Sequence, residues 1–114
     1  MREQGDILLI PIPFTDLSSQ KRRPVIVISN NAYNQKTTDI VVVAMTSNPA
    51  PADYSFTIAS SDLDKGALHR PSRVRVDKIY TLSQSIAVKQ FGRVNEATLE
   101  RIRQTLHDLT GKNS

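Results

Sequence analysis

Short β-prone runs, each closed by proline or turn residues, set the limits on how this chain can fold. Residues 40–45 form the most β-prone run and show no polar alternation, which predicts a strand buried on both faces. Two more apolar runs predict buried strands, and alternating or short apolar patterns predict three others. These further strands are expected at residues 7–10, 25–28, 54–58, 72–78 and 86–88.

The one helical pattern lies at the end of the chain. Asn95 is a typical helix N-cap, and apolar residues then follow at spacings of three and four before Gly111 ends the pattern. These apolar residues are Leu99, Ile102, Leu106 and Leu109. We expect an amphipathic helix after Asn95, a loop at 30–34 and a polar connection at 59–66.

Length and pattern together predict the architecture. The chain has 114 residues, which is enough for one small domain over residues 1–114. Several short strands in so few residues must still protect the edges of their sheet. We therefore expect a mainly β fold: a strongly curved antiparallel barrel or half-barrel with the C-terminal amphipathic helix packed against it.

Composition excludes several classes of chemistry. The chain has no cysteine and two histidines, so disulfides, a cysteine nucleophile and histidine-rich metal sites are excluded. Its four glycines do not cluster into a phosphate-binding loop, and its acids are too scattered for a two-metal site. The apolar run near the start of the chain is too short for a signal peptide, and no apolar run reaches membrane-spanning length. We expect a soluble cytoplasmic protein that needs no metal or cofactor.

Positive charge is concentrated in one quarter of the sequence. Residues 65–93 hold seven basic groups and one acid, Asp77, whereas residues 1–64 carry slightly more acids than bases and 94–114 are balanced. Such a localised basic segment is typical of a protein that binds a polyanion. A solvated charged surface with no partner is the alternative.

The basic segment contains an alternating pattern with chemical potential. In a strand, Arg73, Arg75 and Asp77 would share one face, while Val74 and Val76 would point inward. A carboxylate beside two guanidiniums suits phosphodiester cleavage, because the carboxylate can accept a proton and the guanidiniums can neutralise phosphorane oxygens. An exposed row of ion pairs without catalytic consequence is the alternative.

Two further groups of residues can meet phosphate. Lys21, Arg22 and Arg23 precede Pro24 at a junction between loop and strand, where guanidiniums offer a fixed fork of donors. A solubilising loop is the alternative here. The hydroxyls of Thr46 and Ser47 end a buried strand, where they can bind phosphate or cap the turn that follows.

In combination, these segments resemble the MazF/PemK family, the toxins of type II toxin–antitoxin pairs. The resemblance covers roughly residues 5–110 in the same order: Gly5-Asp6-Ile7 at the start, the Arg23-Pro24 strand and the Thr46-Ser47 strand end. It also includes residues 13–16 and 72–74. Each piece is weak alone, and their common order makes the resemblance specific.

The resemblance implies a fold, an activity and partners. The fold would be a small SH3-like antiparallel β-barrel. The activity would be sequence-specific, metal-independent endoribonuclease cleavage of single-stranded mRNA by 2′-hydroxyl attack. The protein would act as a homodimer whose RNA groove is blocked by a cognate antitoxin protein.

The resemblance also assigns roles to residues. Arg23 and Thr46 match active-site residues of the family, and Arg75 and Asp77 match an Arg-x-Asp pair that some members use. We expect these four to be catalytic, with Asp77 as the candidate general base. The expected RNA-binding residues are Lys21, Arg22, Ser47, Arg73 and Lys78.

One departure and two alternatives stand beside this interpretation. Many family members carry a glutamate five residues before the Arg-Pro arginine, where this chain has Ser18, so no role for that glutamate carries over. The alternatives are a non-enzymatic toxin that binds a protein target such as gyrase, and a catalytically silent nucleic-acid-binding module.

Overall fold

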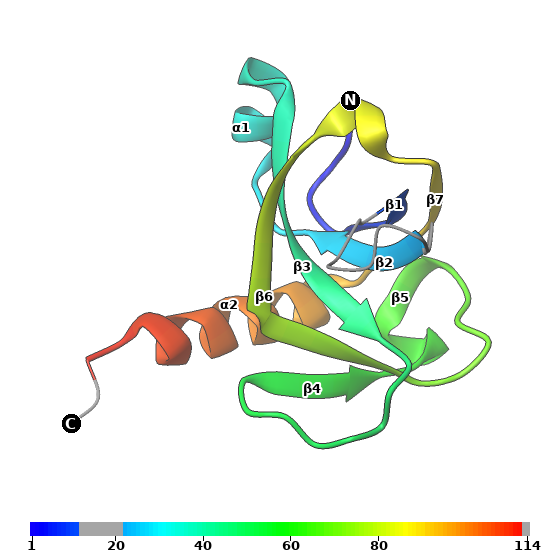
Figure 1. Ribbon diagram of the computed structural model, residues 1–114, viewed down its shortest axis with the longest axis vertical. Coiled ribbons are helices and arrows are strands. Elements are labelled where there is room, and N and C mark those ends of the chain that lie inside the picture. Colours follow the sequence, from blue (N-terminus) through cyan, green and yellow to red (C-terminus); the bar gives the residue numbers. More distant parts are fainter. Residues whose placement is uncertain (12–21, 113–114) are drawn as a thin grey trace.

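The computed structural model describes residues 1–11 and 22–112, which form one antiparallel sheet with helices at its margins (Figure 1). The seven strands lie in the order β4-β6-β3-β2-β1-β7-β5. Their bounds are β1 Asp6–Pro11, β2 Arg22–Val27, β3 Asp39–Thr46, β4 Ser55–Ile58, β5 Leu63–Gly66, β6 Ser72–Ser83 and β7 Lys89–Val94. The helices are α1 Asn31–Lys36 and α2 Glu96–Thr110, with short 3-10 turns η1 Ser60–Asp62 and η2 Gln84–Ile86.

The sheet curls strongly but stays open, with β4 and β5 as its two edge strands. The long strand β6 produces much of this curvature, because one part of it pairs with β3 alone and its first part pairs with both β3 and β4. In Figure 1, β6 bends sharply between these two parts. The predicted curved antiparallel half-barrel with a C-terminal helix is confirmed.

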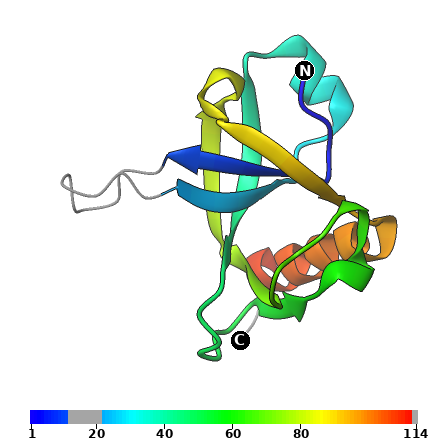
Figure 2. The ribbon, with the colours of Figure 1, turned by 90° about the vertical axis from the view of Figure 1, so that its right-hand side faces the viewer.

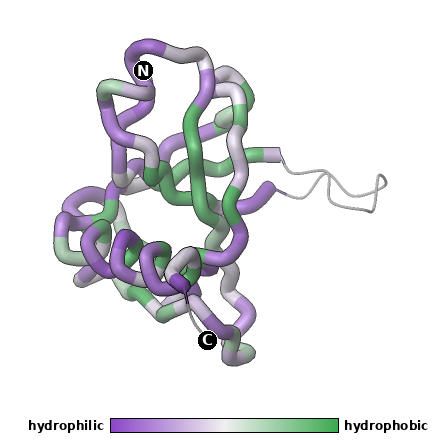
Figure 3. Tube along the Cα trace, turned by 90° about the vertical axis from the view of Figure 1, so that its left-hand side faces the viewer, coloured by the Kyte–Doolittle hydropathy of each residue, from purple (hydrophilic) through white to green (hydrophobic). Residues whose placement is uncertain are grey.

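Strand β3 separates two hydrophobic clusters, as its uninterrupted apolar run predicted. Val43 and Met45 face one cluster, and Ile40 and Val42 face the other. All four are buried. The larger cluster lies between the sheet and α2, and Figure 3 shows the hydrophobic colour concentrated in the central strands. Strand β3 is therefore an interior strand of the sheet that is buried on both faces.

Helix α2 begins at the predicted cap. The side chain of Asn95 accepts a hydrogen bond of 2.8 Å from the backbone N–H of Thr98. Leu99 and Ile102 are buried against the sheet, and the guanidinium of Arg101 lies 4.2 Å from the centroid of the Phe56 ring. Figure 2 shows α2 packed beneath the strands. Among the described residues, no helix is long and apolar enough to span a membrane.

Three sequence-based expectations were wrong in detail. The loop expected at 30–34 contains α1, whose N-cap Asn30 accepts a hydrogen bond of 2.8 Å from Tyr33 N–H. The polar connection expected at 59–66 contains η1 and the edge strand β5. The strand expected at 86–88 is instead the end of η2 and an extended link, and β7 starts at Lys89.

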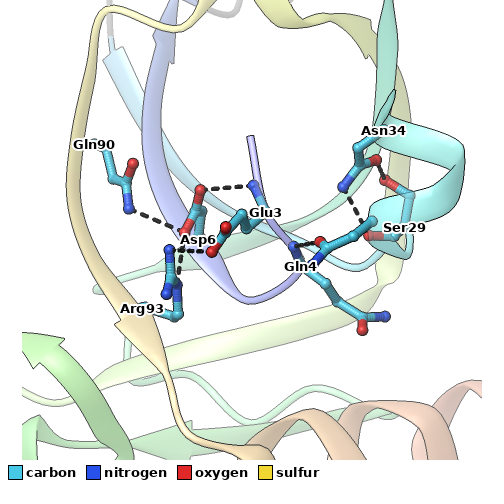
Figure 4. Close-up of polar contacts among 8 residues, drawn as sticks. Glu3, Gln4, Asp6, Ser29, Asn34, Gln90 and Arg93 are labelled. Carbon is cyan, nitrogen blue, oxygen red and sulfur yellow. Dashed lines mark hydrogen bonds and ion pairs between the residues drawn. The ribbon is translucent and has the colours of Figure 1, made fainter. Parts of the chain in front are cut away.

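A buried carboxylate anchors the start of β1 to β7. Asp6 is 1% exposed and accepts hydrogen bonds of 2.9 Å from Gln90 Nε2, Arg93 Nε and the backbone N–H of Glu3. Arg93 also forms an ion pair of 2.7 Å with Glu3 (Figure 4). The hydrogen bond from Arg93 to Asp6 is the main cause that raises the pKa of Arg93. This network closes the β1–β7 side of the half-barrel.

Candidate active site

Strand register gathers the predicted catalytic residues on one face of the sheet. In the β3–β6 pair, Thr46 lies opposite Arg73 and Ala44 lies opposite Arg75. Residues directly opposite each other in an antiparallel pair project to the same face. In the β2–β3 pair Val25 lies opposite Ala44, and the same register continued by two residues directs Arg23 toward Thr46. Three adjacent strands thus contribute to one site.

Two adjoining cavities form a groove over this face. One, of about 330 Å³, is lined by residues of β2, β3, β6 and the segment after β3. The other, of about 280 Å³, shares Arg23, Met45 and Thr46 with it. We call their combined surface the cationic groove, because its described lining residues include five cations and no carboxylate: Arg22, Arg23, Arg73, Arg75 and Lys78.

Hydrogen bonds within the groove position some of its donors. Arg73 Nη1 donates to Ser55 Oγ at 3.0 Å, and Ser55 in turn donates to the carbonyl of Ala52. The Nε of Arg73 is buried and has no hydrogen-bond partner among the described residues. Thr46 Oγ1 accepts from the backbone N–H of Asn48 at 3.1 Å, so its own hydrogen can still be donated. Thr46 therefore caps the turn and lines the groove at once.

Arg75 and Asp77 form a bidentate ion pair at the edge of the groove. Arg75 Nε donates to Asp77 Oδ1 at 2.9 Å, and Nη2 donates to Oδ2 at 2.8 Å. The two side chains are 27% and 28% exposed. The hydrogen bonds from Arg75 are the main cause that lowers the pKa of Asp77, and those same bonds raise the pKa of Arg75. Asp77 is therefore ionised at neutral pH.

The Arg75–Asp77 pair lies at a bulge in β6. The β3–β6 register moves from Ala44–Arg75 to Val43–Ile79, so three residues of β6 after Arg75 have no partner in β3. Asp77 lies at the centre of this bulge. Bulges commonly redirect a side chain beside a functional site. The pattern of alternation predicted a shared face, but it did not predict the irregular backbone at Asp77.

The remaining predicted site residues line the groove, except for one that lies outside the described residues. Arg22 and Ser47 are exposed and line the cavity at the start of β2, and Lys78 lines the larger cavity. Lys21 and Ser18 lie outside the described residues. Tyr80, which sequence reasoning missed, also lines the larger cavity. Its signal was the alternation beyond Lys78, where the strand was expected to end and instead continues to Ser83.

The described residues contain no cluster of three or more histidine or acidic side chains suited to a metal ion. The groove instead contains guanidinium, ammonium and hydroxyl groups that can donate hydrogen bonds. Such donors bind phosphate oxygens and stabilise the extra negative charge of a phosphorane.

Comparison with protein families identifies the chain. A family model of PemK-like, MazF-like toxins of type II toxin–antitoxin systems matches residues 3–110. The chain belongs to this family. The match spans both hydrophobic clusters, the cationic groove and α2, so the PemK-like toxin domain accounts for almost the whole chain. No curated protein matches the chain in a sequence search.

Solved structures show the same PemK/MazF fold. An endoribonuclease in complex with its cognate antitoxin from a mycobacterial species superposes with a TM-score of 0.80 and 23% identity, over 100% of this chain and 99% of that chain. A MazE–MazF complex from Deinococcus radiodurans gives 0.76 and 24%, over 98% of both. A mycobacterial endoribonuclease gives 0.73 and 25%, over 94% of this chain and 88% of that one.

Proposed function

We propose that this toxin is a sequence-specific, metal-independent endoribonuclease that cleaves single-stranded mRNA and so inhibits translation. The observation that carries the proposal is that Arg23, Thr46 and Arg75 line one cationic groove, with Asp77 bound to Arg75 at its edge. Family membership and the mycobacterial endoribonucleases of the same fold support it.

The proposed reaction is an intramolecular transesterification. The 2′-oxygen of a ribose attacks the adjacent phosphorus, and its proton passes to the Asp77 carboxylate. The bond from phosphorus to the 5′-oxygen then breaks, and that oxygen takes a proton from water. The hydroxide left behind accepts the proton held by Asp77, which restores the carboxylate. The products are a 2′,3′-cyclic phosphate and a free 5′-hydroxyl.

Each side chain contributes what its position allows. Arg23 and Arg75 stabilise the negative charge that develops on the phosphorane. Their guanidinium groups are already positioned in the groove, and their hydrogen bonds to the phosphorane oxygens become stronger as that charge grows. Thr46 donates its hydroxyl hydrogen to a phosphate oxygen and positions the scissile bond. The other cations of the groove bind the neighbouring phosphates of the RNA. These contacts do not depend on the RNA sequence.

The toxin's partners follow from the same groove. We propose that a cognate antitoxin inhibits the protein by occupying the cationic groove with an acidic segment, since such a segment complements its charge. The antitoxin complexes found among structures of this fold support this proposal. We also propose a homodimer that works in the cytoplasm, where mRNA is translated.

Cleavage in a chelator tests the proposal directly. Purified protein is incubated with RNA of mixed sequence in excess EDTA, and the fragment ends are mapped by sequencing and mass spectrometry. We expect cleavage at one short sequence, with 2′,3′-cyclic phosphate ends. An Arg23→Ala variant serves as the control against contaminating nuclease, and we expect it to be slower by about 10²–10³-fold.

Three results would contradict the proposal in different ways. RNA that stays intact with and without Mg²⁺ would contradict the ribonuclease proposal and favour a toxin that binds a protein target. RNA that is bound but never cut would identify a silent binding module. Cleavage that appears only with Mg²⁺ would overturn the metal-free mechanism alone.

A further inference from the structure

A third cavity, of about 490 Å³, lies beside the cationic groove and plays no part in the reaction above. Its wall is mostly apolar, and its rim carries hydroxyl, imidazole and cationic side chains. Its lining residues come from β1, β2, β3, β7 and the loop between β5 and β6: Leu9, Pro24, Met45, Ser47, Ala67, Leu68, His69, Arg70, Ser72, Lys89 and Phe91. This size and mixture are typical of a small-ligand pocket.

Two backbone features build this pocket. The β1–β7 register moves from Ile7–Gly92 to Leu8–Gln90, so Phe91 is an extra bulged residue whose side chain lines the cavity. On the neighbouring strand β5, Gly66 has a φ of +81° and lies so close to the Phe91 carbonyl that a Cβ would clash with it. Only glycine fits there, and it turns the chain into the loop at 67–70.

The loop at 67–70 is held in place rather than free. The Leu68 N–H donates to Ser60 Oγ at 2.8 Å, and Ser60 Oγ donates to the Leu68 carbonyl at 3.2 Å. Leu68 also packs against the larger hydrophobic cluster. The next two residues, His69 and Arg70, are exposed at the rim. These contacts of Leu68 fix the loop that forms one side of the pocket.

The pocket adjoins the cationic groove. It shares Pro24, Met45, Ser47 and Ser72 with the cavity that also contains Arg22, Arg23 and Thr46. Its own charged rim residues are Arg70 and Lys89, and its described lining residues include no carboxylate. A ligand in the pocket would thus lie next to the phosphate that Arg23 and Thr46 engage.

We propose that this pocket receives one unpaired base of the single-stranded RNA, next to the scissile phosphate. The inference rests on the proposed ribonuclease function and gives it a specificity determinant. The base stacks against the half-buried Phe91 ring, as bases of single strands do on aromatic side chains. Arg70 and Lys89 contact the phosphate of that nucleotide. Ser47, Ser72 and His69 offer hydrogen bonds to the edge of the base.

The chemistry of the pocket favours a base over other occupants. An apolar wall with one aromatic ring suits a flat ring system, and cations at the rim suit the phosphate attached to it. Base-specific recognition in RNA depends on this combination of stacking and edge hydrogen bonds. The cations of the adjacent groove contact phosphates, and such contacts bind all sequences alike.

The test measures binding of RNA that cannot be cleaved. Short RNAs with 2′-O-methyl groups lack the attacking hydroxyl, and their sequence is taken from the cleavage site that the wild-type protein shows. An abasic nucleotide replaces each base in turn, and the dissociation constants of wild type, Phe91→Leu, His69→Ala and His107→Ala are compared. His107 is an exposed histidine on α2 and serves as the matched control for His69.

We expect one base whose removal weakens binding to the wild-type protein by roughly 5- to 150-fold. Phe91→Leu should weaken binding of the intact RNA to a similar extent, and removal of that one base should then cost little more. His69→Ala should change the preference for the base at that position, while His107→Ala should behave like wild type. Thermal melting confirms that the leucine variant is folded.

The outcomes separate the two proposals. The proposed base pocket would be wrong if every abasic position weakened RNA binding equally. It would also be wrong if the loss of affinity from base removal simply added to the loss from Phe91→Leu. Either result would count against the pocket even if the protein cleaves RNA normally. If the wild type cuts no RNA, the ribonuclease is overturned, and homopolymeric 2′-O-methyl RNAs replace the mapped sequence. In that case equal affinities of wild type, Phe91→Leu and His69→Ala for all four homopolymers would overturn the pocket as well.

Discussion

At the scale of single residues, Arg75 and Asp77 act as one unit. Both carboxylate oxygens of Asp77 accept hydrogen bonds from Arg75, which keeps the carboxylate ionised and orients the guanidinium. We expect Asp77→Asn to lower the cleavage rate by about 10²–10⁴-fold, because a positioned base is lost. RNA affinity should stay equal or rise, since a negative charge near phosphate is removed. Cleavage at the wild-type rate would show that Asp77 is only an ion-pair partner.

The same pair predicts a pH dependence with a definite sign. The pKa of Asp77 is lowered in the folded protein, so the carboxylate stays available until the pH falls below the ordinary carboxyl range. Arg75→Lys keeps the positive charge but removes the bidentate hydrogen bonds, which are the main cause of that lowering. The acid limb of the pH–rate profile should therefore move to higher pH in this variant. If the acid limb does not move, the group that titrates there is not Asp77.

At the scale of elements, the Asp6 network predicts how firmly β1 is attached to β7. Asp6→Asn removes the charge that Arg93 pairs with and leaves the shape of the side chain unchanged. We expect a loss of about 1.5–3 kcal/mol in the free energy of unfolding, measured by urea denaturation. Asp53→Asn removes the charge of an exposed carboxylate in the turn before β4; it is the matched control and should change stability by much less. Equal losses in the two variants would contradict a structural role for the network.

The elements also show how far sequence reasoning reaches. The strands with apolar or alternating runs and the helix α2 were predictable, because burial imposes a regular pattern on them. The helix α1 was missed because its six polar residues carry no apolar stripe, although Asn30 is a recognisable cap. The strand β5 was missed because a short polar edge strand has little to bury. The sequence alone predicted Arg23, Thr46, Arg75 and Asp77 as site residues. The bulge at Asp77 and the place of Tyr80 in the groove depend on strand register, which the sequence pattern does not show.

At the scale of the whole molecule, the short groove predicts a dimer. A domain of 12.7 kDa offers a groove with only five described cations, and a two-fold axis would double the surface that RNA can follow. Two large apolar side chains, Ile79 and Val88, are more than 40% exposed in the protomer. We expect light scattering at micromolar concentration to give twice the chain mass. A monomer mass in a preparation that still cleaves RNA would contradict the dimer.

The net charge of the groove also sets how RNA affinity depends on salt. Each phosphate neutralised on a single strand contributes about −0.7 to the slope of log affinity against log salt concentration. Arg73 is the cation best suited to a pure binding role, because Ser55 holds its Nη1 and it lies opposite Thr46 at the groove floor. Arg73→Ala should weaken RNA binding and reduce the slope by about 0.7, measured by fluorescence titration with 2′-O-methyl RNA. Lys36→Ala removes an exposed cation from α1, far from the lining residues of the groove in the fold, and should leave the slope unchanged. If both variants change the slope equally, RNA binding follows the overall charge of the protein and the groove has no special part in it.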